Sequence, residues 1–115
     1  MRLVRCAMAL VPVLALTLFH TAAARAADVD SAACKRDLSA ASAGVTATLA
    51  RLKGLAKARA DDKCAAYRTQ FLVVVRARAV FANCKTGAER DTEVGRLDGT
   101  IEDINGAIAE SCVVQ

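Results

Sequence analysis

The sequence predicts an all-α fold, an up-down-up three-helix bundle crosslinked by two disulfides and preceded by a cleaved signal peptide. Three observations carry this prediction. The first 26 residues have the pattern of a secretory signal, four cysteines remain in the rest of the chain, and apolar residues recur there every three or four positions. No alternation of period two is long enough to predict a sheet.

The N-terminus carries the parts of a secretory signal peptide. Two arginines precede an apolar run over residues 6–19, and Ala24-Arg25-Ala26 then offers the small-x-small pattern that signal peptidase accepts. We predict a signal peptide over residues 1–26 and a mature domain over residues 27–115, with cleavage after Ala24 as the alternative. A retained membrane anchor is the competing interpretation, but an apolar run of about 14 residues is shorter than the roughly 20 that span a bilayer.

Removing the predicted signal peptide changes the net charge. The whole chain has 16 basic and 12 acidic residues, a net charge of +4. Three of the basic residues and none of the acidic ones lie before Ala27, so the mature chain has 13 against 12, a net charge of +1. Because nucleic-acid binding needs a large uncompensated positive surface, we expect no nucleic-acid partner. Export places the mature protein in the periplasm or outside the cell.

Apolar positions with the helical period predict helices over about residues 31–57, 62–83 and 87–111. Each predicted helix begins near residues that can cap an N-terminus. These residues are Asp30 or Ser31 for the first helix, Asp61 for the second, and the capping box Thr86 with Glu89 for the third.

Four cysteines in an oxidising compartment predict two disulfides: Cys34, Cys64, Cys84 and Cys112. A zinc site of four thiolates is the competing interpretation, but the separations of 30, 20 and 28 residues lack the close pairs typical of zinc ligands. A helix of 20 residues spans roughly 30 Å, whereas the Cα atoms of a disulfide lie within about 7 Å, so the two ends of one helix cannot be joined. In an up-down-up bundle the pairs that meet are Cys34–Cys84 and Cys64–Cys112. Cys84 falls off the apolar stripe of its helix, and we expect it in the turn after Asn83.

The mature chain offers no recognisable catalytic or metal site. The one histidine of the whole sequence, His20, lies in the predicted signal peptide, so in the mature chain a serine or cysteine nucleophile has no histidine base. The cysteines are committed to disulfides, and no calcium-type loop is present in the sequence. We therefore expect a non-enzymatic protein without metal or cofactor, which contacts another envelope or secreted protein.

Two surface features are candidates for such a contact. Five cations surround the turn between the first two helices, and three glycines share one face of the third helix. The cations suit a weak contact with an anionic surface, or they serve only to complement a helix dipole. The glycine face suits a homodimer through the third helix, or it is simply tolerated in water. The residues are Arg51, Lys53, Lys57, Arg59 and Lys63, and Gly95, Gly99 and Gly106.

Arg78 stands out because it lies within the apolar stripe of the second helix, where a charge must be paired or reach water. Asp37 and Asp91 are its predicted partners. The alternative function is a small-ligand-binding protein whose interhelical pocket near Arg78 includes Tyr67 and Phe71.

Charge is also segregated along the chain. Residues 34–85 carry 11 basic and 3 acidic side chains, a net charge of +8, and residues 86–115 carry 2 against 7, a net charge of −5. This pattern either stabilises the packing of the helices or presents a dipolar surface to a charged partner.

Overall fold

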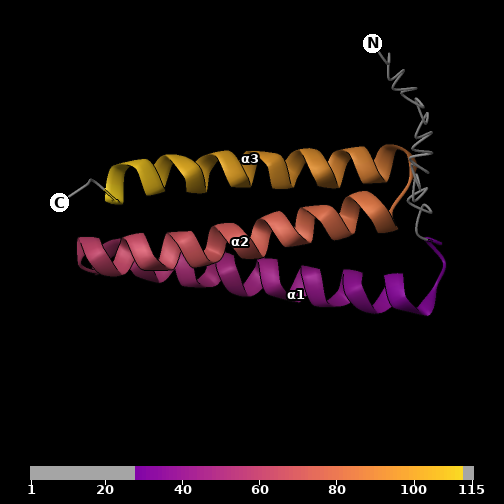
Figure 1. Cartoon of the computed structure of the whole chain (residues 1–115), viewed down its shortest axis with the longest axis horizontal. Helices are drawn as coiled ribbons and strands as arrows, with labels where there is room; N and C mark the ends of the chain where they lie inside the picture. The colour runs from indigo at the N-terminus through magenta and orange to yellow at the C-terminus, as the bar shows by residue number, and fades with distance from the viewer. Residues whose placement is uncertain (1–27, 113–115) are drawn as a thin grey trace, which may run out of the picture.

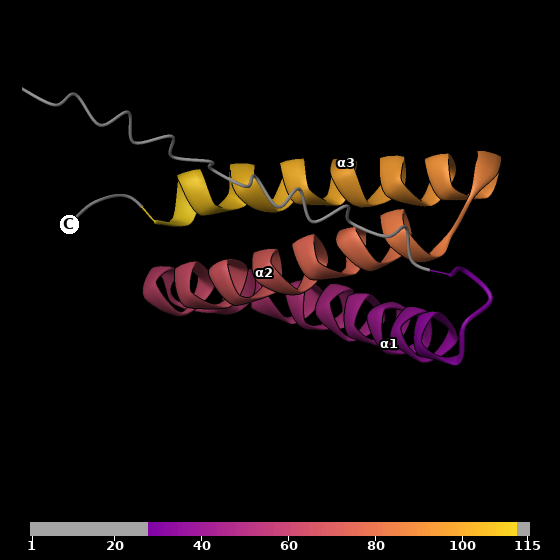
Figure 2. The same ribbon diagram turned by 45° about the vertical axis from the view of Figure 1, so that its right-hand side comes forward.

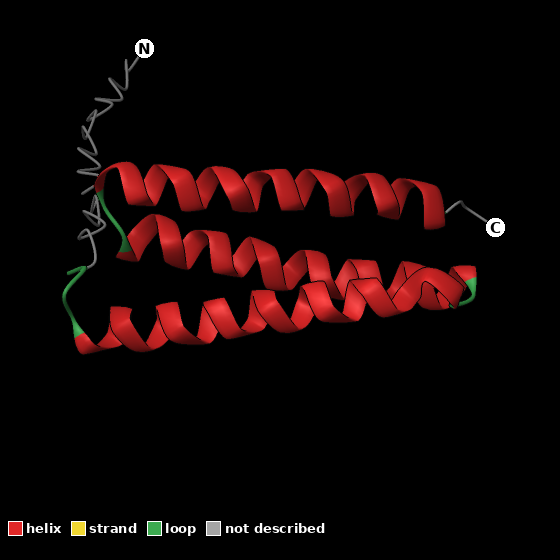
Figure 3. Cartoon of the chain, turned by 180° about the vertical axis from the view of Figure 1, so that it is seen from behind, coloured by secondary structure: helices red, strands yellow, loops and turns green. Residues whose placement is uncertain are grey.

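The computed structural model describes residues 28–112 and shows three long helices, each antiparallel to the next (Figure 1). They are α1 (Ala32–Gly54), α2 (Ala60–Cys84) and α3 (Gly87–Ser111), and a short 3₁₀ helix, η1 (Leu55–Lys57), follows α1. Figure 3 shows short loops between the helices and no strand in this part of the chain, so the predicted all-helical fold is confirmed. The predicted signal peptide lies outside the described residues.

The helix α2 lies in the middle of the molecule. Both α1 and α3 pack along it, whereas α1 and α3 scarcely approach each other, and Figures 1 and 2 show them on different sides of α2. Because α2 is covered from two directions, a wide arc of its surface is buried. The outer helices each keep a broad face open to water.

The N-terminus of α1 is capped by Ser31, one of the two residues that the sequence offers for this role. The Cys34 backbone N–H donates to Ser31 Oγ at 3.1 Å, so Ser31 is the capping residue and Asp30 is not. The helix ends at Gly54, three residues before the predicted end, because the chain tightens there into the 3₁₀ turn η1.

The predicted cap of α2 is wrong, and that of α3 is right in position but not in its hydrogen bonds: Thr86 is the N-cap residue without a capping box. The helix α2 begins at Ala60, which places Asp61 inside the first turn, where its charge complements the helix dipole. The Thr86 side chain makes no capping bond, and Glu89 pairs with Lys85 instead of closing a capping box. The connection into α3 depends on Gly87, whose φ of +62° strains any residue with a Cβ.

The two disulfides are the predicted ones. Cys34 joins Cys84 with a Cα–Cα distance of 5.3 Å, and Cys64 joins Cys112 at 5.1 Å, so each end of α2 is tied to a different neighbour. Cys84 is the last residue of α2 and not part of a following turn, which corrects the prediction. Cys84 can bond to Cys34 from within the helix because α1 packs against α2 on a different side from α3, and Cys84 lies on the side that faces α1.

All three helices contribute to one thin apolar core. Its fully or nearly fully buried members are Val45 from α1, Val74, Ala77 and Phe81 from α2, and Leu97 and Ile104 from α3. The predicted stripes supply most of these residues. The apolar residues at helical spacing in α2 also include Val75, which is nevertheless 36% exposed. Thr48 and Gln70 are polar and nevertheless buried. None of the helices in residues 28–112 is long and apolar enough to cross a membrane.

Candidate interaction surface

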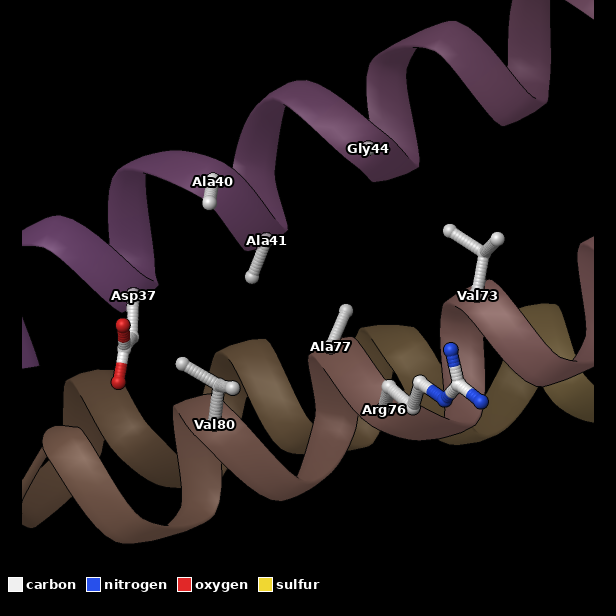
Figure 4. Close-up of a pocket in the computed structure, with 8 residues that line it drawn as sticks. All are labelled: Asp37, Ala40, Ala41, Gly44, Val73, Arg76, Ala77 and Val80. Carbon is white, nitrogen blue, oxygen red and sulfur yellow. The ribbon is translucent and has the colours of Figure 1, made fainter.

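A groove of about 340 Å³ runs between α1 and α2 (Figure 4). Its walls consist of apolar and mostly small side chains, and a charged residue lies toward each end. The lining residues are Asp37, Ala40, Ala41 and Gly44 from α1, and Val73, Arg76, Ala77 and Val80 from α2.

The groove exists because small side chains face each other across the two helices. Alanines at positions 40, 41 and 77 reach only one carbon beyond the backbone, and Gly44 reaches none (Figure 4). A Cβ built on Gly44 would stand 3.5 Å from Val73 Cγ1, an ordinary van der Waals distance. The backbones are therefore close enough to pack, but the side chains do not fill the space above the contact.

Opposite charges stand at the two ends of this groove. Figure 4 shows the Asp37 carboxylate at one end and the Arg76 guanidinium toward the other, beside Val73. Asp37 is exposed and lies 3.7 Å from Arg36 Nε, a loose pair between chain neighbours. Within residues 28–112 the structure records neither a hydrogen bond nor an ion pair for Arg76. The apolar walls thus lie between a weakly paired anion and an unpaired cation.

An exposed apolar residue lies beside the groove. Leu72 is one helical turn before Arg76 on α2 and is 54% exposed, more than any other large apolar side chain of the described residues. Residues four apart share a helix face, so Leu72 and Arg76 project from the same side of α2. Neither residue lies on the apolar stripe that marks the core, so the sequence alone does not single out Leu72 or Arg76.

The Arg78 side chain is paired, but with a carboxylate other than the two predicted. Its Nε and Nη2 atoms donate to Oδ1 and Oδ2 of Asp98 on α3, the second bond measuring 3.1 Å. Asp37 instead lines the groove, and Asp91 lies 3.3 Å from Arg90. The Arg78 side chain is 41% exposed, so the pair is at the rim of the core and not within it.

The register of α2 and α3 explains this partner. Arg78 follows Cys64 by fourteen residues and Asp98 precedes Cys112 by fourteen, so the disulfide between those cysteines sets the two side chains level. The hydrogen bond from Arg78 lowers the pKa of Asp98 below its ordinary value of 3.8, against the opposing effect of partial burial. The same bond raises the pKa of Arg78.

The other candidate surfaces lie away from this groove. The five cations gather where α1 ends and α2 begins, and one of them, Arg59, lies 3.4 Å from Asp62. On α3, a Cβ built on Gly95, Gly99 or Gly106 would meet nothing within 4 Å, so the glycine face is open. In the described part of the chain no three potential metal ligands form a cluster.

Together, the fold and the groove define a small, disulfide-linked α-helical bundle. Its two disulfides indicate a protein outside the reducing cytosol. Comparison of the chain with models of protein families, with curated proteins and with solved structures finds no match. Function is therefore inferred from the geometry of the molecule itself.

Proposed function

We propose that this chain is a small exported protein, periplasmic or secreted, that acts by binding another macromolecule and not by catalysis. The groove between α1 and α2 is its contact surface. The observation that carries the proposal is an apolar groove with small side chains, held between two helices that a disulfide crosslinks.

The rigidity of this helix pair favours binding. A short turn through η1 joins α1 and α2 at one end, and Cys34–Cys84 joins them at the other. A surface that is fixed before it meets its partner loses less conformational entropy on association. The groove lies between the two fixed ends, so its shape is set by covalent links as well as by packing.

The lining suits a packing contact with a helix or an extended segment. Small side chains let a partner's backbone approach closely, and the apolar walls supply the hydrophobic part of the interface. Asp37 and Arg76 give the partner an orientation through charge. These residues include no nucleophile beside a base, which is the arrangement that covalent catalysis requires.

The alternative, a ligand pocket near Arg78, has less support. Asp98 already accepts hydrogen bonds from Nε and Nη2 of Arg78 and offsets its charge, which weakens the attraction of Arg78 for an anionic ligand. Tyr67 and Phe71 pack against the apolar core. The groove is lined by α1 and α2, whereas Arg78 reaches toward α3.

Site-specific photocrosslinking of the exported full chain tests the proposed surface. A photoreactive amino acid replaces Ala40 in the groove or, as the matched control, the exposed Ala109 on α3. We expect a covalent adduct with a protein from position 40 and none from position 109. If position 40 forms no adduct, or only as much as position 109, the groove is not a binding surface.

A further inference from the structure

We infer that the occupant of the groove is a second copy of this chain, bound in a two-fold symmetric dimer. This inference rests on the proposed function, because it names the partner of the surface proposed above. Charge complementarity and the exposed apolar side chains support it, and the net charge of the chain does not oppose it.

Charge complementarity is the first support. A two-fold dimer brings the same patch of both copies together, so the patch must complement itself. The groove has Asp37 toward one end and Arg76 toward the other (Figure 4). A two-fold axis perpendicular to the line between them sets each carboxylate opposite the other copy's guanidinium. Two ion pairs then form from one unpaired cation and one loosely paired anion per chain.

The distribution of exposed apolar side chains is the second support. The large apolar residues that the described chain leaves exposed are Leu49 on α1 and Leu72 and Val75 on α2, and none is on α3. Leu72 projects on the same side of α2 as Arg76, so the pairing of charges brings Leu72 to the other copy. A dimer through the glycine face of α3 would bury no such side chain and is therefore disfavoured.

Net charge does not oppose the association. The chain beyond the predicted signal peptide has 13 basic and 12 acidic residues, so two copies repel each other only weakly. Eight residues line the groove, whereas a standard interface uses about 20–30 residues on each side. We therefore expect a reversible dimer with a dissociation constant between about 1 μM and 1 mM.

Sedimentation equilibrium of the oxidised mature protein over that concentration range tests the inference. The wild type is expected to shift from monomer to dimer. Asp37→Arg places two arginines opposite each other at both ends of the interface, and Arg76→Glu places two acids there. We expect each variant to dimerise about tenfold more weakly or not at all.

Mixing the two variants gives a sharper test. In a dimer of one Asp37→Arg chain and one Arg76→Glu chain, both contacts join opposite charges again. The mixture is expected to dimerise within about threefold of the wild type, although neither variant does so alone. A merely structural role for either residue would not produce this rescue. Helical content and the disulfide pattern of each variant, measured separately, show that it has folded.

Gly99→Arg on α3 is the matched control and is expected to leave dimerisation unchanged. A wild type that is monomeric throughout the range, or a dimer abolished by Gly99→Arg and not by the groove variants, overturns the inference. If the protein is monomeric while a photoreactive group at position 40 joins it to a different protein, the binding function stands and the second copy is excluded. If neither dimer nor adduct forms, both proposals fail.

Discussion

Replacement of Gln70 by methionine is expected to stabilise the protein, although Gln70 is among its most buried residues. The Gln70 side chain is 4% exposed, and no group of the described residues donates a hydrogen bond to its Oε1 atom. Methionine is also unbranched and of similar length, so it removes the amide while keeping most of the packing.

The magnitude follows from two opposing effects. A buried polar atom without a partner costs about 1–3 kcal/mol, and Gln70→Met removes that cost. An apolar replacement that conserves volume loses less than about 1.5 kcal/mol through imperfect packing. The expected net gain is about 1 kcal/mol in the free energy of unfolding, equivalent to a rise of about 4–8 °C in Tm for a domain of this size.

Guanidinium denaturation of the oxidised protein, followed by helical circular dichroism, measures this change. The midpoint should rise with no change in the dependence on denaturant concentration. Gln70→Ala is the control, because it removes the same amide but leaves a cavity, and we expect it to destabilise. If Gln70→Met lowers the free energy of unfolding by about 1 kcal/mol or more, the amide is satisfied in solution and the reasoning is refuted.

Three further perturbations probe the core, a crosslink and the ion pair. Leu97 is fully buried in the apolar core, so Leu97→Ala should lower the free energy of unfolding by about 2.7–5 kcal/mol in the same denaturation assay, and a loss below about 1 kcal/mol would contradict that placement. The Cys64–Cys112 disulfide closes a separation of 48 residues, so replacing both cysteines by alanine should remove about 4 kcal/mol, seen as a lower Tm, and an unchanged Tm would argue against the bond. The pKa of Asp98 is lowered on folding, so the stability it supplies is complete above its unfolded value of 3.8 and is lost as pH falls through the lower folded value. Asp98→Asn should therefore flatten the loss of stability in acid, and an acid limb identical to the wild type would show that the ion pair does not contribute.

The disulfide pairing was predictable because it depends on the lengths of the helices and the directions in which they run, and the sequence indicates both. Helices of more than twenty residues keep the cysteines at their two ends far apart, and short connections force neighbouring helices to run in opposite directions. At their end of the bundle, Cys34 and Cys84 are then each the only cysteine that the other can reach. No side-chain detail was needed for that result.

The buried surface of α2 was predicted less well. The periodicity of apolar residues indicates which side of a helix is apolar, but not how many other helices pack against that helix. A stripe drawn through the large apolar residues of α2 included Val75, which is 36% exposed. It omitted Gln70 and Ala77, which are buried because α1 covers α2 on one side while α3 covers it on another. A central helix has a wider buried arc than its apolar stripe indicates.

The partner of Arg78 was within reach of the sequence. Counting fourteen residues inward from each cysteine of the Cys64–Cys112 bond gives Arg78 on α2 and Asp98 on α3. Asp37 and Asp91 follow only from a coarser alignment of the helices. The groove, by contrast, left no comparable signal. It arises where Ala40, Ala41 and Ala77 fail to fill a space, and alanine is common on every face of this bundle.

Non-reducing tryptic mapping of the oxidised protein tests the alternating arrangement of the helices most directly. Trypsin separates the four cysteines of residues 28–112, since a lysine or arginine lies between each two successive ones. Peptide 79–85 should be recovered joined to the peptide that ends at Lys35, and peptide 64–68 joined to peptide 97–115. Recovery of peptide 64–68 joined to peptide 79–85 would link the two ends of α2, which a straight helix of 25 residues forbids, and would contradict the fold.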